Sequence, residues 1–222
     1  MRNIFIVIPA YNEEKNIGGV IDGIKNKLPE VSIVVVDDNS SDNTFDEIKK
    51  RKIFALKHIV NRGQGAALQT GNDFALSSGA DIIVHFDGDG QHRVEDINKL
   101  IQPIIEKEAQ IVLGSRFLED KSDIPLTKKF LILKPALLVN YFFTGIKLSD
   151  AHNGLRALSA EVAKKIKITQ DKMAHNTEII SEIKRNKLKY KEVPVEVIYN
   201  EYGQGFFDGL KILKDLIIKK IL

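Results

Sequence analysis

Five short apolar runs, separated by stretches of helical periodicity, constrain the fold of this chain more than any other feature. These runs are rich in β-branched residues and mostly apolar on both faces, as is typical of parallel strands covered by helices on each side. The predicted strands are Ile4–Ile8, Val31–Val36, Leu56–Val60, Ile82–Phe86 and Ile111–Leu113, and the predicted helices are Glu14–Leu28, Asp42–Lys52, Gln64–Ser78 and Val94–Lys107. The alternation predicts an α/β fold with a doubly wound, mostly parallel sheet flanked by helices.

The second half of the chain is less regular. Its predicted elements are an interfacial or lid-like helical pair over Leu126–Ile146, loop and strand over Asp150–Leu158, helices near Ala160–Ile166 and Thr177–Asn186, an extended run over Leu188–Tyr199, and an amphipathic helix over Phe206–Leu222. No repeat or linker marks a boundary. We therefore expect a single domain over residues 1–222, with a ligand-binding part at 1–120 and a second part at 121–222.

Composition excludes several classes of protein. The chain has no cysteine, which excludes disulfides, thiolate metal sites and cysteine nucleophiles. Its net charge of +3 comes without a concentrated basic stripe, so we expect no nucleic-acid partner. No apolar run reaches the roughly 20 residues that span a bilayer. We expect a cytoplasmic protein, at most peripheral to the inner face of the cell membrane.

Polar and glycine-rich segments follow all five predicted strands. In chain order they are Pro9-Ala10-Tyr11-Asn12-Glu13, Asp37-Asp38-Asn39-Ser40, Asn61-Arg62-Gly63, Asp87-Gly88-Asp89-Gly90-Gln91 and Gly114-Ser115-Arg116. The carboxyl ends of parallel strands meet at one edge of the sheet, where open α/β folds bind their ligands. This edge is therefore the predicted active site.

The segment Asp87-Gly88-Asp89-Gly90-Gln91 is the sharpest of these motifs. Two crowded carboxylates and an amide offer hard oxygen ligands to Mg²⁺ or Mn²⁺. A polar turn is the alternative. An EF-hand loop starting at Asp87 would need glycine and glutamate where the chain has His92 and Asn98. An aspartyl-phosphate phosphatase would carry its motif on the first strand, and here it follows the fourth.

Together these motifs resemble family 2 glycosyltransferases of the GT-A fold, a Rossmann-like class. The similarity is strongest to the branch of dolichol-phosphate mannosyltransferases and polyprenyl-phosphate glycosyltransferases. It is clear over about residues 3–120 and continues weakly to about 200. The motifs that carry it are Pro9–Glu14, Val36–Asp42, Asn61–Ala67, Asp87–His92 and Gly114–Arg116. The glycines near Gln64 lack the Lys-Ser/Thr of a P-loop, so a turn opening a helix is the favoured interpretation there.

The resemblance implies a role for each matching residue. The nucleotide-sugar would be bound by Pro9, Ala10, Tyr11, Glu13, Asp38, Asp87, Gly88 and Arg116, and the metal ion by Asp87, Asp89 and Gln91. The fork of Arg116 suits a phosphate. Tyr11 could instead cover the sheet end, and Arg116 could instead form a surface salt bridge.

The candidate catalytic residues are Asp89, Arg116, Asp150 and Glu178. Asp150 and Arg156 lie in a segment that resembles the part of the family closing over sugar and acceptor, with a loop salt bridge as the alternative. Glu178 stands near the position of the base in relatives with hydroxyl acceptors, and first-turn dipole chemistry is its alternative. A lipid-phosphate acceptor would need no strong base.

The acceptor stays open between a lipid phosphate and a saccharide. Lipid-phosphate enzymes of this branch carry basic residues after the strand that ends in Val193-Pro194-Val195, and this chain has none in the stretch that follows. The Phe206–Leu222 helix could lie on a membrane surface. It could equally pack on its own domain or on a second subunit in a homodimer.

The resemblance implies a metal-dependent transfer that inverts the anomeric carbon. Two other functions remain as alternatives. A sugar-phosphate nucleotidylyltransferase would normally carry a glycine-rich loop with Arg and Lys after its first strand, where this chain has the acidic Glu13-Glu14. A non-catalytic nucleotide-sugar-binding module would show no turnover with any donor.

Overall fold

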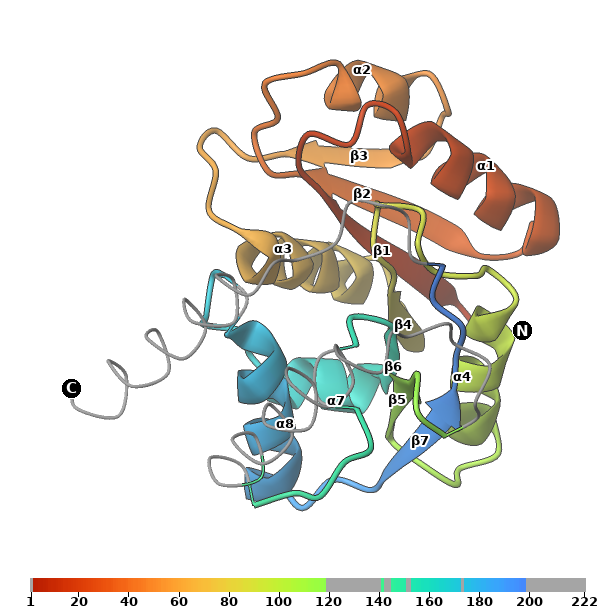
Figure 1. Cartoon of the computed structure of the whole chain (residues 1–222), viewed down its shortest axis with the longest axis vertical. Coiled ribbons are helices and arrows are strands. Elements are labelled where there is room, and N and C mark those ends of the chain that lie inside the picture. The colour runs from red at the N-terminus through yellow and green to blue at the C-terminus, as the bar shows by residue number, and fades with distance from the viewer. Residues whose placement is uncertain (1, 119–140, 142–144, 151–152, 173, 199–222) are drawn as a thin grey trace.

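Four parallel strands from the first part of the chain form one half of the sheet in the computed structural model. The structure describes residues 2–118, 141, 145–150, 153–172 and 174–198. The four strands are β1 (Ile4–Ala10), β2 (Ser32–Asp37), β3 (Phe54–Lys57) and β4 (Ile82–His85), in the spatial order β3-β2-β1-β4 (Figure 1). The predicted doubly wound, mostly parallel sheet is confirmed.

The other half of the sheet is mixed. It contains β5 (Ile111–Ser115), β6 (Arg156–Ser159) and β7 (Tyr190–Pro194), and the full order is β3-β2-β1-β4-β6-β5-β7. Strand β6 is antiparallel to both β4 and β5, and β7 is parallel to β5. Strand β5 therefore points the same way as β4. Because β6 and β7 belong to residues 121–222, the two predicted parts of the chain share one sheet.

Helices cover both faces of the sheet (Figure 1). On one face lie α1 (Ile17–Lys27), α2 (Thr44–Lys49) and α4 (Asp96–Ile105), and on the other lie α3 (Gln64–Ser77), α7 (Ala160–Lys165) and α8 (His175–Arg185). Successive side chains of β1 alternate between the two cores: Ile6 and Ile8 pack in the first, and Phe5 and Val7 in the second. This alternation is the period of two that a strand imposes.

Helix α3 lies close to the centre of the sheet because Gly71 faces β1. A methyl group at Gly71 would overlap the side chain of Val7, approaching its Cβ to 3.4 Å. The absence of a side chain thus lets the helix backbone approach the strand. This contact fixes where the first turn of α3 reaches the sheet edge.

One sequence prediction about a strand needs correction. The third strand is Phe54–Lys57 rather than Leu56–Val60, since Ile59 and Val60 are 94% and 60% exposed and follow the strand as a loop. The strand predicted within Asp150–Leu158 is confirmed as β6, which ends at Ser159; it lies between β4 and β5, a position that the sequence did not predict. The predicted helices before Ala109 are confirmed with ends shifted by a few residues.

Several predictions fall outside the described residues. These are most of the Leu126–Ile146 helical pair and all of the Phe206–Leu222 helix. Among the residues that the structure does describe, no helix is both long and apolar enough to cross a bilayer.

Candidate active site

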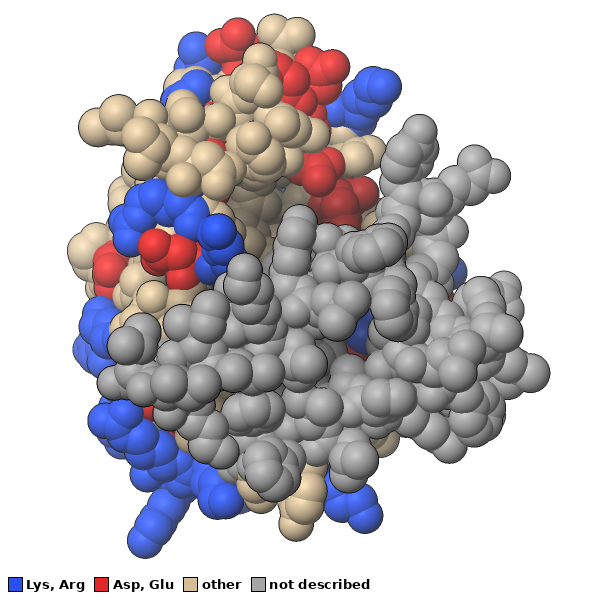
Figure 2. Space-filling view, turned by 60° about the vertical axis from the view of Figure 1, so that its left-hand side comes forward, with Lys and Arg blue, Asp and Glu red and all other residues tan. Residues whose placement is uncertain are grey.

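The carboxyl ends of β1, β2, β4 and β5 meet at one edge of the sheet, as predicted. The register pairs Ala10 of β1 with Asp37 of β2, and the backbone N–H of Asp38 donates to the carbonyl of Ala10 at 2.8 Å. Strand β4 ends two residues before Asp87. The polar segments therefore lie side by side, and Figure 2 shows Asp and Glu side chains gathered beside a hollow in the molecular surface.

Three carboxylates from two segments lie close enough at this edge to affect one another's ionisation. Burial raises the pKa of Asp89, and the charge of Asp87 raises it further. Burial likewise raises the pKa of Glu13, and the charges of Asp89, Asp42 and Asp87 add to it although Asn16 donates a hydrogen bond. A raised pKa means that ionised carboxylates are crowded and poorly hydrated. Such a cluster favours a bound cation.

Asp87 is held on both of its oxygens. Gln64, the first residue of α3, donates from Nε2 to Oδ1 at 2.8 Å, and His92 Nε2 lies 3.1 Å from Oδ2. Burial acts to raise the pKa of Asp87, but the hydrogen bond from His92 and the positive charges nearby outweigh it and lower the pKa. Asp87 is therefore the carboxylate of the cluster that stays ionised most readily.

The residues present fit a divalent cation by their chemistry. Asp87 and Asp89 supply hard oxygens, and their mutual repulsion is what a cation would relieve. Gln91 donates its backbone N–H to Asp89 Oδ1 at 3.0 Å, which keeps it beside the pair. Within the described ranges, no group of three or more His, Cys, Asp or Glu side chains converges on a single metal position. The assignment of Asp87, Asp89 and Gln91 as ligands stays a prediction.

The predicted nucleotide-binding residues line the β1 and β2 side of the edge. Pro9 and Ala10 are the last two residues of β1 and are buried, and Gly88 is buried beside them. Tyr11 is 49% exposed, so its ring is available to a ligand. Glu13 is anchored through its backbone N–H, which donates to Thr44 Oγ1 at 2.7 Å.

Asp38 organises the loop that precedes α3. Its carboxylate accepts hydrogen bonds from the backbone N–H groups of Arg62 (2.9 Å) and Gly63 (2.6 Å), and His58 Nδ1 lies 2.7 Å from Oδ1. Gln64 follows directly and contacts Asp87. Asp38 thereby links the predicted base-binding end of the edge to the acidic cluster.

Arg116 and Asp150, both predicted to be catalytic, form an ion pair. Arg116 donates from Nε and Nη2 to the two carboxylate oxygens, and its backbone N–H donates to Oδ2 at 3.2 Å. Glu192 of β7 accepts from the backbone N–H groups of Ser149 (3.0 Å) and Asp150 (3.3 Å). The ion pair is thus attached to the sheet on both sides: Arg116 directly follows β5, and Asp150 is held by Glu192 of β7. Its role toward a substrate stays a prediction.

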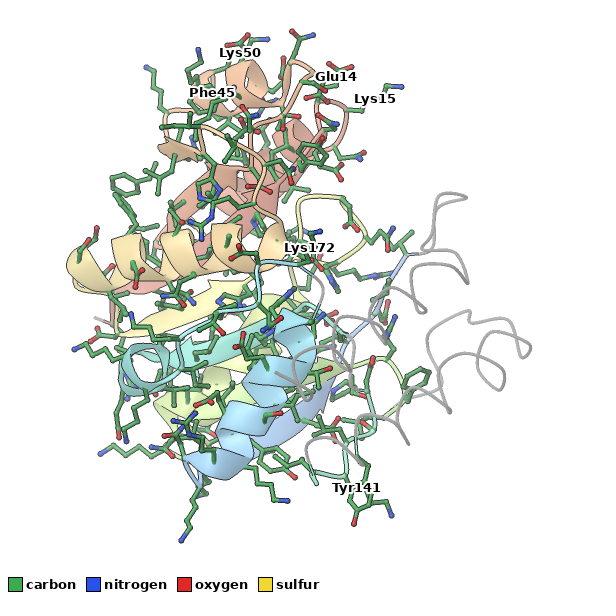
Figure 3. The ribbon with its side chains drawn as sticks, turned by 90° about the vertical axis from the view of Figure 1, so that its left-hand side faces the viewer. Glu14, Lys15, Phe45, Lys50, Tyr141 and Lys172 are labelled. Atoms are coloured by element: carbon green, nitrogen blue, oxygen red, sulfur yellow. The ribbon has the colours of Figure 1, made fainter. Side chains whose placement is uncertain are left out.

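Glu178, the remaining catalytic candidate, holds a loop. Its carboxylate accepts from the backbone N–H groups of Thr169 and Gln170, both at 2.9 Å, and from the Thr169 hydroxyl. Asp171, which follows Gln170, accepts a hydrogen bond from the backbone N–H of Gly65 through its own backbone carbonyl, at 2.8 Å. Lys172 accordingly lies beside the N-terminal end of α3 (Figure 3). The N–H groups of Gly65, Ala66 and Ala67 donate to carbonyls of the protein itself, which is consistent with a turn rather than a phosphate cradle.

Sequence reasoning missed three contacts of Asp87. The structure adds Gln64, His92 and Gly154, whose backbone lies directly against the carboxylate. Gln64 had been assigned only to a turn, although its place at the start of a helix facing the edge was a usable signal. The contact between Asp87 and Gly154 forms only in the folded chain, and no sequence pattern indicates it.

The doubly wound sheet with an acidic turn at the carboxyl end of β4 defines a glycosyltransferase of the GT-A class. The model described as "Glycosyl transferase family 2" matches residues 5–167, and the chain belongs to this family. This membership excludes the nucleotidylyltransferase alternative.

Known proteins support this assignment over nearly the whole chain. An uncharacterized protein of Methanocaldococcus jannaschii is 40% identical over 98% of this chain and 92% of its own length. The UDP-N-acetylglucosamine–dolichyl-phosphate N-acetylglucosaminyltransferase of Methanococcus voltae is 37% identical over 98% of this chain and 96% of its own length. The crystal structure of glucosyl-3-phosphoglycerate synthase from Mycobacterium tuberculosis, in complex with Mn²⁺, UDP and glucosyl-3-phosphoglycerate, superposes with a TM-score of 0.77 at 19% identity, covering 97% of this chain and 77% of that one. The last similarity shows the fold alone.

Proposed function

We propose that this enzyme transfers a sugar from a UDP-sugar to a polyprenyl phosphate, with inversion at the anomeric carbon. A phosphate oxygen of the acceptor attacks the anomeric carbon, the bond to UDP breaks, and UDP leaves with the electron pair. The observation that carries the proposal is the cluster of Glu13, Asp87 and Asp89 at the carboxyl end of the sheet, where burial, followed by the neighbouring negative charges, raises the pKa of Glu13 and Asp89.

In this proposal Asp87, Asp89 and Gln91 hold Mg²⁺ or Mn²⁺. The ion would act as a Lewis acid on the departing diphosphate, a contribution of several kcal/mol in metal enzymes. The chain's own residues prepare the position: Gln64 and His92 hold Asp87, and the backbone of Gln91 holds Asp89. The low pKa of Asp87 keeps it ionised for this task.

We take uracil as the base from a relative rather than from Asp38. That carboxylate is 3% exposed and already accepts hydrogen bonds from Arg62, Gly63 and His58, so it does not discriminate between bases. The relative from Methanococcus voltae is named for a UDP-sugar.

A polyprenyl phosphate acceptor agrees with the environment of Glu178. That carboxylate is engaged by Thr169 and Gln170, and an acceptor phosphate that is already ionised requires no general base. The relative from Methanococcus voltae is named for dolichyl phosphate. Such an acceptor would bring the enzyme to the inner face of the cell membrane. The C-terminal segment 206–222 would contact that membrane or a second subunit.

Thermal unfolding with UDP or GDP, each with and without Mn²⁺, tests the donor site, because a ligand that binds only the folded state raises the melting temperature. We expect the largest rise for UDP with Mn²⁺. A transfer assay with UDP-N-acetylglucosamine and a short polyprenyl phosphate should then release UDP. Transfer to a saccharide in place of the lipid phosphate would refute the acceptor proposal. The absence of turnover with every donor would favour a non-catalytic module.

A further inference from the structure

Arg156 is a buried arginine beneath the acidic cluster. It is the first residue of β6, is only 2% exposed, and pairs in register with His85, two residues before Asp87. From the sequence, it was a candidate for contact with the sugar or the acceptor. Its burial argues against direct contact and calls for another function.

The guanidinium of Arg156 donates only to neutral acceptors among the described residues. Nε donates to the Gly154 carbonyl at 3.1 Å, and Nη2 donates to the Asn153 carbonyl at 3.3 Å and to Asn176 Oδ1 on α8. The planar fork therefore ties the turn at residues 153–154 to the start of α8. The described part of the chain shows no ion pair for this side chain.

The turn that Arg156 holds lies against Asp87. A methyl group on Gly154 would come within 2.9 Å of Asp87 Oδ1 and 3.0 Å of its Cγ. The carboxylate is therefore bounded by the Gly154 backbone on one side and held by Gln64 and His92 through its oxygens. Moving the turn would change the space that Asp87 occupies.

The charge of Arg156 also acts on Asp87. Burial lowers the pKa of Arg156 to about 10, with Asp87 acting in the opposite direction, so the guanidinium remains charged at neutral pH. The hydrogen bond from His92 acts on the pKa of Asp87 in the same direction as the charge of Arg156 and is the larger influence.

We infer that Arg156 is a positioning residue of the donor site: its guanidinium holds the Asn153-Gly154 turn against the carboxylate of Asp87. It acts through Asp87 and touches neither sugar nor acceptor. The inference rests on the proposed function only in taking Asp87 as a residue that faces the metal and donor. Neighbours that orient a metal ligand commonly contribute about 10- to 100-fold to metal affinity.

The test measures Mn²⁺ binding to the purified protein at pH 7 without donor or acceptor, from the signal of free Mn²⁺ in electron paramagnetic resonance. Arg156→Gln removes the guanidinium fork from the Asn153 and Gly154 carbonyls, and we expect about tenfold weaker binding by a folded protein. Gly154→Ala places a methyl group against the Asp87 carboxylate and should weaken binding by a similar factor. The matched control Arg185→Lys, at a side chain 79% exposed on α8, should bind Mn²⁺ as the wild type does.

Wild-type binding by both variants with their folds intact would overturn the inference. So would an Arg156→Gln enzyme in which only the KM for the acceptor rises, because that result indicates direct contact. If Arg156→Gln does not fold, Arg156→Lys replaces it, and weaker Mn²⁺ binding by a folded protein is then expected. Failure of the proposed function would look different: Mn²⁺ binding would follow these expectations while no UDP-sugar is turned over.

Discussion

Arg116 and Asp150 meet at two points, with Nε 2.6 Å from Oδ2 and Nη2 2.8 Å from Oδ1. The two residues are 34 positions apart in the chain and come from the end of β5 and the loop before β6. Paired hydrogen bonds of this kind fix the plane of the guanidinium as well as its position. The geometry gives Arg116 one orientation at the edge where the donor is proposed to bind.

Arg116→Lys should reduce transfer by about tenfold or more, because an ammonium cannot reproduce both hydrogen bonds of the fork. Steady-state release of UDP measures the effect, and the melting temperature shows whether the fold is retained. Arg185→Lys, at an exposed position, serves as the matched control. A folded Arg116→Lys enzyme with unchanged kcat/KM would contradict the expectation.

Asp89→Asn should stabilise the metal-free protein while reducing transfer by about 100-fold or more, the cost of losing several kcal/mol of metal-assisted stabilisation. Burial and Asp87 raise the pKa of Asp89 in the folded state above its unfolded value. Its protonated form therefore favours folding, and that stability is lost as pH rises through the folded pKa. Asparagine stays neutral and avoids the loss at pH 7.

Thermal unfolding with and without Mn²⁺ checks both parts of this prediction. The ion should raise the melting temperature of the wild type more than that of Asp89→Asn. Asp73→Asn, at an exposed carboxylate on α3, is the control and should behave as the wild type. A lower melting temperature for metal-free Asp89→Asn, or full transfer activity, would count against the assignment.

His175→Asn should weaken the dependence of stability on acid pH. Burial, followed by the charge of Arg156, lowers the pKa of His175 to about 4, against 6.5 for the free side chain. Between these two pH values His175 is protonated in the unfolded chain but neutral in the folded protein. The free energy of unfolding therefore falls as pH drops from about 6.5 to about 4. Asparagine keeps a donor for the Lys172 carbonyl without titrating.

Urea unfolding at pH 7 and pH 4.5 measures this difference. The fall in unfolding free energy should be smaller in His175→Asn than in the wild type. Part of the fall should persist, because His85 is buried and has its pKa lowered in the same direction. Equal falls in the two proteins would show that His175 is already protonated or accessible in the fold.

Glu178→Gln should keep most of the transfer activity, whereas removal of a required general base costs about 10²- to 10⁴-fold. The amide oxygen can still accept from Thr169 and Gln170, so the loop remains held. Glu178→Ala loses these acceptors and should lower the melting temperature. A folded Glu178→Gln enzyme with transfer reduced a hundredfold would instead identify Glu178 as the base.

The parallel half of the fold could be predicted because its strands are buried on both faces and leave apolar runs in the sequence. The position of β6 between β4 and β5 could not be predicted, since Arg156-Ala157-Leu158-Ser159 is short and begins with a charged residue whose burial depends on α8 and the turn before it. The displaced β3 has a related cause. Ile59 and Val60 have strand propensity, but the fold leaves them exposed.

The candidate site was predictable where the predicted metal ligands are neighbours in sequence. Asp87, Asp89 and Gln91 belong to one turn, and their oxygen-bearing side chains predict a cation site from the sequence alone. Gln64 and Gly154 reach Asp87 only through tertiary structure, from α3 and from the turn before β6. The ion pair of Arg116 with Asp150 joins two residues that had been selected separately, and no local pattern links them.

The position of β6 between β4 and β5 also has a consequence for biosynthesis. Strands β1 to β4 can pair as they leave the ribosome, but β5 has no partner until Ser159 has been made, because its neighbours are β6 and β7. The open edge of β4 is meanwhile a surface on which another nascent chain could add a strand. A protein truncated before residue 156 should accordingly aggregate during synthesis rather than accumulate as a stable fragment.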